Sequence, residues 1–210
     1  NLALQLTARG VPFIYYGEEI GMENHSLDIK KSLDALAVKY SKIPRFILDT
    51  VKKFLGESLN RDESRTPMQW DTSLYSGFSA KNAVPWLPIT PSYKERNVRI
   101  QSENTDSLLN CYKRFLKLRK ETPALNSGNL VLINSSEIPS SVLSYIRSYS
   151  FESEKQIAII YLNMSKETVE FKNPHKYANF TESTTIHSKN EKMKNRDIHL
   201  FPWEGVVYIA

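Results

Sequence analysis

The sequence contains few of the residues that build covalent cross-links and metal sites. It has one cysteine, Cys111, which excludes an internal disulfide and leaves no CxxC pair for zinc. The four histidines show no HxxxH spacing, so the sequence predicts no metal site. Because Cys111 falls in an apolar-periodic stretch, we interpret it as a buried structural thiol. We therefore expect neither a bound metal nor another cofactor.

The chain also lacks long runs of one residue type. Without about 18 consecutive apolar residues, the sequence predicts no membrane span and no membrane partner. The net charge is +5, but the 28 basic residues are mixed with 23 acidic ones and no five like charges are adjacent. We interpret this as a solvated surface rather than a nucleic-acid-binding one. Asn1 lies inside a helical pattern, without a methionine or a visible signal peptide, so we expect a piece of a longer, cytoplasmic protein.

What the chain does contain begins with a helix followed by a strand. Hydrophobic residues form 40% of the 210, enough for a packed core. Residues 1–9 have apolar residues at helical spacing and Gly10 as a stop signal. The run 11–16 (VPFIYY) ends at Gly17 and is typical of a strand buried on both faces. A helix, a glycine and a buried parallel strand form the repeating step of an α/β sheet or barrel.

The next segment divides into a helix and a long loop. Residues 24–60 are amphipathic, and their apolar spacing predicts a helix that starts at Pro44 and ends at Gly56. The following residues, up to about 100, are irregular and rich in turn-forming and aromatic residues. Long irregular loops within compact domains usually carry function, so we expect the site in this loop.

The last part of the chain changes from helical to strand periodicity. A helix is predicted over 105–121, with Thr105 or Asp106 as its cap. Beyond it, apolar residues alternate with polar ones in seven short runs separated by turns. Such runs predict an antiparallel sandwich or barrel. We place the domain boundary near residue 126, which divides the chain into 1–126 and 127–210.

Two motifs resemble a known family. The segments 10–22 (GVPFIYYGEEIGM) and 65–71 (RTPMQWD) closely resemble the α-amylase superfamily, glycoside hydrolase family thirteen, in its oligo-1,6-glucosidase and α-glucosidase branch. The resemblance implies an α/β fold followed by an all-β domain: the end of a (β/α)8 TIM barrel and a C-terminal antiparallel β-sandwich. It makes 1–9 the end of barrel helix seven, 11–16 the eighth strand and 105–121 the eighth helix.

The same resemblance implies a retaining hydrolase of short α-glucosides, whose full-length form takes an oligosaccharide substrate. Retention needs a nucleophile and an acid/base carboxylate about 5–5.5 Å apart. In the family these groups follow barrel strands four and five, and a further aspartate follows strand seven, so all three lie upstream of Asn1. The adjacent pairs Glu18–Glu19 and Asp62–Glu63 are not placed as facing partners. We therefore expect no catalytic residue in this chain and no activity from it on its own.

Arg65, the arginine of RTPMQW, is the predicted substrate-binding residue. The resemblance implies that this arginine reaches the sugar pocket, where a guanidinium presents five donors in a fixed fork. The alternative interpretation is a structural ion pair with Asp62 or Asp71.

Four further residues are expected to line or support the pocket. Tyr16 is expected near it, and Glu19, the glutamate of the family's YGxE motif, is expected to tie the strand end to adjacent loops. Trp70 and Phe78 have faces on which a sugar ring can stack. Aromatic residues in a dense loop more often form its own small core, and both interpretations remain open.

Two other functions fit the same motifs. The heavy subunit of amino-acid transporters, which is not an enzyme, resembles this branch through YYGEEIGM and PMQWD. The arginine within RTPMQW favours the enzyme over that relative. A trehalose synthase-like glucosyl isomerase is the other alternative. The sequence predicts neither the glycosidic linkage that is cut nor the oligomeric state.

Overall fold

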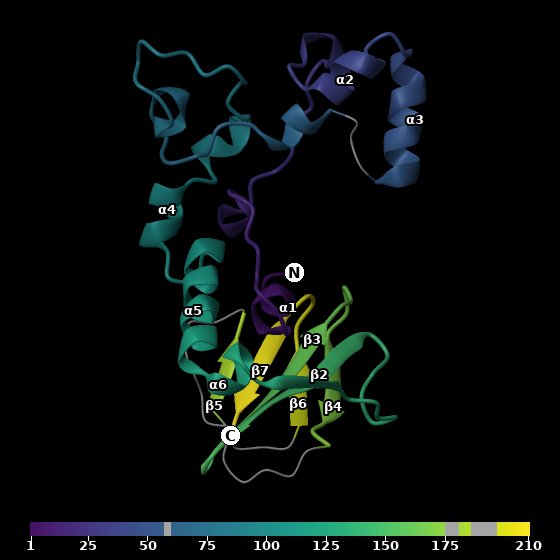
Figure 1. Cartoon of the computed structure of the whole chain (residues 1–210), viewed down its shortest axis with the longest axis vertical. Coiled ribbons are helices and arrows are strands. Elements are labelled where there is room, and N and C mark those ends of the chain that lie inside the picture. Colours follow the sequence, from purple (N-terminus) through teal and green to yellow (C-terminus); the bar gives the residue numbers. More distant parts are fainter. Residues whose placement is uncertain (57–59, 175–180, 186–196) are drawn as a thin grey trace. The chain divides into compact units, whose positions relative to one another are not determined.

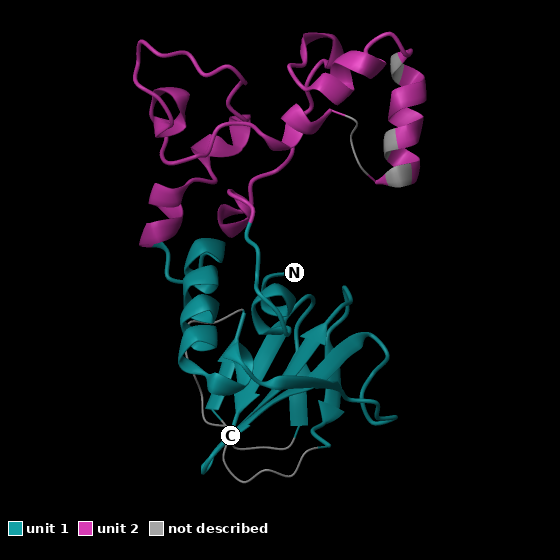
Figure 2. Ribbon diagram, in the orientation of Figure 1, with its two compact units in different colours: residues 1–14, 104–210 teal, residues 15–103 magenta. Residues whose placement is uncertain are grey.

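The computed structural model describes residues 1–56, 60–174, 181–185 and 197–210. The chain divides into two compact units, which are coloured separately in Figure 2. One unit joins residues 1–14 to residues 104–210, and the other consists of residues 15–103. The division at residue 126 concerns the domains of a longer protein and stays a prediction.

The first unit is built on two antiparallel sheets (Figure 1). A five-stranded sheet has the order β1-β2-β3-β7-β5, and β4 pairs with β6 in a second sheet. The strands are β1 (Asn129–Leu132), β2 (Val142–Phe151), β3 (Glu154–Asn163), β4 (Val169–Lys172), β5 (Thr181–Thr184), β6 (Asp197–Leu200) and β7 (Gly205–Ile209). These correspond to the seven predicted alternating runs, so the prediction of an antiparallel β domain is confirmed.

Alternation at period two separates two apolar clusters, one on each face of the large sheet. On one face, Tyr145 and Ile160 pack against the helices. On the other, Ile159 and Tyr161 pack against Phe171 and its neighbours in the small sheet. The central strands are therefore buried on both faces, which explains their nearly continuous apolar sequence.

Three helices cover the first face: α1 (Leu2–Thr7), α5 (Leu108–Glu121) and α6 (Pro123–Asn126). The helix predicted over 105–121 is confirmed, but its predicted caps are wrong. Ser107 is the cap, and its hydroxyl accepts a hydrogen bond of 3.2 Å from the backbone N–H of Asn110. Ser107 has extended backbone angles directly before the first helical turn, the geometry that lets a short side chain reach the N3 amide.

Two buried arginines hold the C-terminal end of α1. Arg119 of α5 donates to the carbonyls of Leu6 and Ala8, both at 2.9 Å, and Arg147 of β2 donates to the carbonyl of Thr7 at 2.6 Å. The last carbonyls of a helix have no partner within the helix and favour nearby cations. Burial lowers the pKa of both guanidinium groups. These bonds fix the chain where it leaves α1, a role that the sequence pattern did not reveal.

Residues 11–15 have no regular secondary structure and Tyr16 begins a turn, so the run forms no strand, and Val11 and Phe13 are 78% and 84% exposed. The prediction that this run is buried is wrong for this chain. A parallel strand needs hydrogen-bonded neighbours on its sides, and no described residue pairs with this run. Its assignment as the eighth strand of a barrel stays a prediction about a longer protein.

The second unit contains short helices and loops. Its α-helices are α2 (Ala35–Tyr40), α3 (Arg45–Leu55) and α4 (Val98–Glu103), and its 3-10 turns are η1 (Glu18–Ile20), η2 (Ile29–Lys31), η3 (Arg61–Ser64), η4 (Leu74–Gly77) and η5 (Pro91–Lys94). The helix predicted between Pro44 and Gly56 is confirmed as α3, and Gly56 takes a positive φ of 72° after its end. Across both units, none of the described helices has the length and apolarity needed to cross a membrane.

Candidate functional site

The site forms around Arg65, which directly follows η3. The side chain of Asn60 caps this turn by accepting a hydrogen bond of 3.2 Å from the N–H of Asp62. The backbone N–H of Arg65 then bonds to the carbonyl of Asp62 at 3.1 Å. The turn therefore fixes the backbone from which the Arg65 side chain extends.

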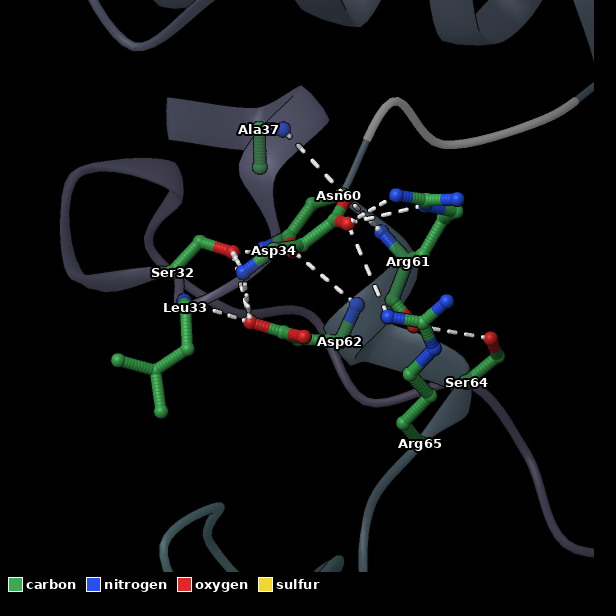
Figure 3. Close-up of polar contacts among 9 residues, drawn as sticks. All are labelled: Ser32, Leu33, Asp34, Ala37, Asn60, Arg61, Asp62, Ser64 and Arg65. Carbon is green, nitrogen blue, oxygen red and sulfur yellow. Dashed lines mark hydrogen bonds and ion pairs between the residues drawn. The ribbon is translucent and has the colours of Figure 1, made fainter. Parts of the chain in front are cut away.

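Asp34 is the carboxylate that faces Arg65. Its side chain is 1% exposed, and one of its oxygens, Oδ1, lies 3.7 Å from Nη1 of Arg65. The same oxygen accepts hydrogen bonds from Nε and Nη2 of Arg61, at 2.9 and 2.5 Å (Figure 3). The bonds from Arg61 hold the pKa of Asp34 at about 2, so the carboxylate is charged. The predicted alternative partners of Arg65, Asp62 and Asp71, were therefore wrong.

Asp62 connects the two ends of the segment between residues 32 and 62, which carries α2 and α3. Its Oδ2 accepts from the hydroxyl of Ser32 at 2.7 Å and from the backbone N–H groups of Leu33 and Asp34 at 2.8 and 3.0 Å (Figure 3). Burial raises the pKa of Asp62, but these hydrogen bonds outweigh it and the pKa lies below its ordinary value. Asp62 thus joins residues 32–34 to the turn that precedes Arg65.

Tyr16 lies close to Arg65. Its hydroxyl donates to the carbonyl of Thr66 at 3.1 Å, and its ring centre lies 4.8 Å from that of Tyr15. Burial and the neighbouring Tyr15 raise the pKa of the Tyr16 hydroxyl, while the positive charge of Arg65 lowers it. The structure thus brings together two of the predicted site residues from motifs that are far apart in sequence.

Glu19 supports its own turn rather than an adjacent loop. Its Oε2 accepts a hydrogen bond of 2.8 Å from the N–H of Gly17. Gly17 has a φ of 90°, and a Cβ at this position would lie 2.5 Å from the sulfur of Met22. Only glycine fits this turn without strain, so the YGxE motif encodes a tight turn directly after Tyr16.

The aromatic residues of the loop do not form its core. Trp70, Phe78 and Trp86 are 49%, 47% and 69% exposed, whereas Met68 and Leu87 are buried. The interpretation of these aromatic rings as a small core is wrong for this chain, because the loop buries its aliphatic side chains. The backbone N–H of Trp70 donates to the carbonyl of Ser76 at 2.9 Å, and the carbonyl of Trp70 accepts from the N–H of Arg99 at 3.0 Å.

The two acidic pairs, Glu18–Glu19 and Asp62–Glu63, accept hydrogen bonds from the chain itself. Glu18 accepts from the N–H of Tyr15 at 3.2 Å, and Glu63 accepts from the N–H of Leu27 at 3.3 Å. Glu19 and Asp62 are bonded as described above, so each of the four carboxylates accepts a hydrogen bond from a backbone N–H group. Among the residues that the structure describes, no group of His, Cys, Asp and Glu is placed to hold a metal ion.

A hollow of about 950 Å³ lies beside α3, between residues 26–30 and 41–49. Its lining includes Lys30 and Lys42 together with Asp28 and Asp49. None of the predicted site residues lines it. We therefore place the candidate site at Arg65 and not in this hollow.

The sequence did not reveal Asp34 and Arg61 as parts of the site. Asp34 did carry a local signal, because an aspartate directly before the run ALAVKY is a typical helix cap. Nothing local linked it to Arg65, which lies far along the chain. Arg61 carried no signal of its own.

The order of elements is the one that the motif resemblance implies. A helix, an irregular segment, a loop that exposes an arginine and aromatic rings, and a second helix lie ahead of an antiparallel β domain. Residues 1–128 match the family described as "Alpha amylase, catalytic domain", and the chain belongs to this family.

Relatives match over nearly the whole chain. It is 32% identical to the oligo-1,6-glucosidase of Parageobacillus thermoglucosidasius, over 95% of this chain and 35% of that protein. It is 30% identical to the glucan 1,6-alpha-glucosidase of Streptococcus dysgalactiae subsp. equisimilis, over 94% of this chain and 35% of that protein. The chain thus spans about a third of the length of these curated relatives.

A solved structure confirms the predicted fold class. The crystal structure of the trehalulose synthase MutB from Pseudomonas mesoacidophila MX-45 is similar with a TM-score of 0.75 and 28% identity, over 100% of this chain and 37% of that chain. The fold class is therefore the end of a TIM barrel followed by an antiparallel β domain.

Proposed function

We propose that this chain is the C-terminal part of a retaining α-glucoside hydrolase of the oligo-1,6-glucosidase type, which acts on short α-glucosides. Two relatives named for 1,6-glucosidase activity match almost the whole chain, which supports this assignment. The catalytic carboxylates lie outside these 210 residues. A cytoplasmic location is part of the proposal, and cell fractionation tests it.

Residues 1–126 complete the catalytic barrel, and residues 127–210 form its C-terminal β domain. The family match ends at residue 128, close to this boundary, which supports the division. In the complete barrel, residues 11–16 take the place of the eighth strand. Neighbouring strands then cover the apolar side chains that are exposed in this chain.

The observation that carries the proposal is the exposure of the Arg65 side chain and its lack of a hydrogen bond to Asp34. Its side chain is 40% exposed, and among the described residues its guanidinium makes one ion pair, at 3.7 Å to Asp34. This separation exceeds hydrogen-bonding distance, so the guanidinium donors remain available for sugar hydroxyls. Trp70 and Phe78 expose faces on which a glucose ring can stack, and Tyr16 supports the pocket beside Arg65.

The test is Arg65→Lys in the full-length protein that contains this chain. Lysine keeps the charge but loses the fork of donors. Loss of hydrogen bonds from a charged donor costs about 1.5–3 kcal/mol, so kcat/KM for an α-glucoside falls roughly ten- to a hundredfold. The matched control is Arg96→Lys, since Arg96 is similarly exposed at 45% and is paired with Glu23. An unchanged kcat/KM for Arg65→Lys removes Arg65 from the site.

A glucosyl isomerase is a second candidate, supported by the structural similarity to a trehalulose synthase over the whole chain. Product analysis of the full-length protein separates the two functions. A hydrolase releases glucose from an α-1,6-linked disaccharide such as isomaltose, whereas an isomerase converts sucrose into another disaccharide.

A further inference from the structure

Asp34 contacts both arginines of the segment that precedes TPMQW, although it belongs to a different part of the chain. It caps α2, where its Oδ2 accepts from the N–H of Ala37 at 3.4 Å. Oδ2 also accepts from the backbone N–H of Arg61 at 3.3 Å, and Oδ1 accepts the two side-chain bonds from Arg61. Asp34 is therefore fixed by four hydrogen bonds, and Arg65 takes part in none of them.

The contact with Arg65 differs in kind from the contact with Arg61. At 3.7 Å, Asp34 attracts the Arg65 guanidinium without accepting a hydrogen bond from it. Arg61 occupies the lone pairs of Oδ1 that Arg65 would otherwise use (Figure 3). A buried, fixed charge thus orients the guanidinium and leaves its donors uncommitted.

The charges of this cluster balance. Asp34 and Asp62 supply two negative charges, and Arg61 and Arg65 supply two positive ones. Removal of the Asp34 carboxylate leaves both guanidinium groups without the counter-charge that they share, and removal of Arg61 leaves Oδ1 of Asp34 open to direct bonding by Arg65. We expect both changes to alter the position of the Arg65 fork without altering Arg65 itself.

We propose that Asp34 is the positioning residue for Arg65: the cap of α2 holds the sugar-binding guanidinium in place through a long ion pair. The proposal rests on the proposed function, in which Arg65 binds sugar hydroxyls. It also gives the segment that carries α2 and α3 an indirect part in substrate binding, through Asp34.

The test is a double-mutant cycle in the full-length protein with Asp34→Asn and Arg65→Met. Asparagine caps a helix as well as aspartate does, so the substitution removes the charge and keeps the cap. Residues in contact have an interaction free energy, which corresponds here to a change of about three- to tenfold in kcat/KM. We therefore expect Asp34→Asn to lower kcat/KM by that factor, chiefly through a higher KM. In the Arg65→Met background, Asp34→Asn has no further effect.

The control variant is Asp28→Asn, because Asp28 caps the neighbouring turn η2 in the same way, at 3.1 Å to the N–H of Lys30, and carries the same charge. This variant keeps kcat/KM at the wild-type value. If Asp34→Asn does not fold, Arg61→Met replaces it in the cycle. That variant raises KM through direct bonding of Arg65 to Asp34, again with no effect once Arg65 is methionine.

Three results overturn the inference. Additive effects of Asp34→Asn and Arg65→Met mean that Asp34 acts on stability and not through Arg65. A normal KM for Asp34→Asn, with a raised KM for Arg65→Met, refutes the positioning role and leaves the proposed function intact. A normal KM for Arg65→Met removes Arg65 from the site and refutes both.

Discussion

The two compact units of this chain are stabilised in different ways. The unit of residues 1–14 and 104–210 buries two apolar clusters against the faces of one sheet, including fully buried Leu6, Phe115 and Ile160. The unit of residues 15–103 buries few large apolar side chains but encloses the carboxylates of Asp34 and Asp62. The first is stabilised chiefly by the hydrophobic effect, with hydrogen bonds from the buried Arg119 and Arg147 in addition. The second depends on hydrogen bonds to buried carboxylates.

This difference has a consequence for function. A packed apolar core tolerates changes of pH but not the loss of volume. A network of buried carboxylates and arginines tolerates neither the loss of a partner nor protonation. The candidate site lies in the second unit, so the geometry of Arg65 depends on the ionisation of Asp34.

The largest expected effect is on the stability of the unit of residues 1–14 and 104–210, the apolar unit. Phe115 of α5 is 1% exposed and packs in the cluster between the helices and the sheet. Phe115→Ala removes most of a buried ring and destabilises this unit by about 3–5 kcal/mol. Urea unfolding followed by hydrogen exchange in each unit measures this. Equal loss of protection in residues 15–103 would contradict the distinction between the units.

A smaller loss of stability, confined to the unit of residues 15–103, is expected when the pH is lowered. The pKa of Asp34 is about 2, below its ordinary value of 3.8, because of its hydrogen bonds from Arg61. A carboxylate with a depressed folded pKa contributes stability above pH about 4, and this is lost as the pH falls towards about 2. Asp62 and Asp71 have lowered pKa values and act in the same direction.

Hydrogen exchange of the 210-residue chain between pH about 5 and 2 checks this expectation, after correction for the intrinsic pH dependence of exchange. Residues 15–103 lose protection in this window while the sheet of the other unit keeps it. The Asp34→Asn variant serves as the control and shows a weaker pH dependence. Simultaneous loss of protection in both units would show that the polar network has no separate role.

The smallest effect is expected on the surface of α3. Phe54 is 91% exposed, so Phe54→Ser removes almost no buried area. The stability of the 210-residue chain should change by less than about 0.5 kcal/mol. Thermal unfolding of the variant measures the change, and a loss above about 1.5 kcal/mol would mean that this ring is packed in solution.

The sequence predicted the apolar unit better than the polar one, for a physical reason. Alternation at period two is a local signal, and it located every strand that the structure describes in the β domain. Sequence pattern failed where the structure depends on other segments. Residues 11–16 have the composition of a buried strand, but a strand forms only beside hydrogen-bonded neighbours. The cap of α5 was misplaced by one or two residues, since several short polar residues precede that helix.

The candidate site was predicted in part. A motif resemblance singled out Arg65 and Tyr16, and the structure brings them together through Thr66. Asp34 was missed because a contact between a buried carboxylate and a distant arginine produces no local or periodic pattern in the sequence. The interpretation of the aromatic residues as a small core was wrong, because burial in a loop depends on its path, which composition does not specify.

The central claim is that this chain supplies a substrate contact but no catalytic carboxylate. The most direct test measures kcat of the full-length protein with each of Glu18→Gln, Glu19→Gln, Asp62→Asn and Glu63→Gln. Every variant that folds keeps kcat within about tenfold of wild type, whereas loss of a catalytic group costs roughly 10⁴-fold or more. The 210-residue chain correspondingly shows no hydrolysis of p-nitrophenyl α-glucoside above background. A loss of that size in any folded variant would place a catalytic carboxylate within this chain and contradict the account.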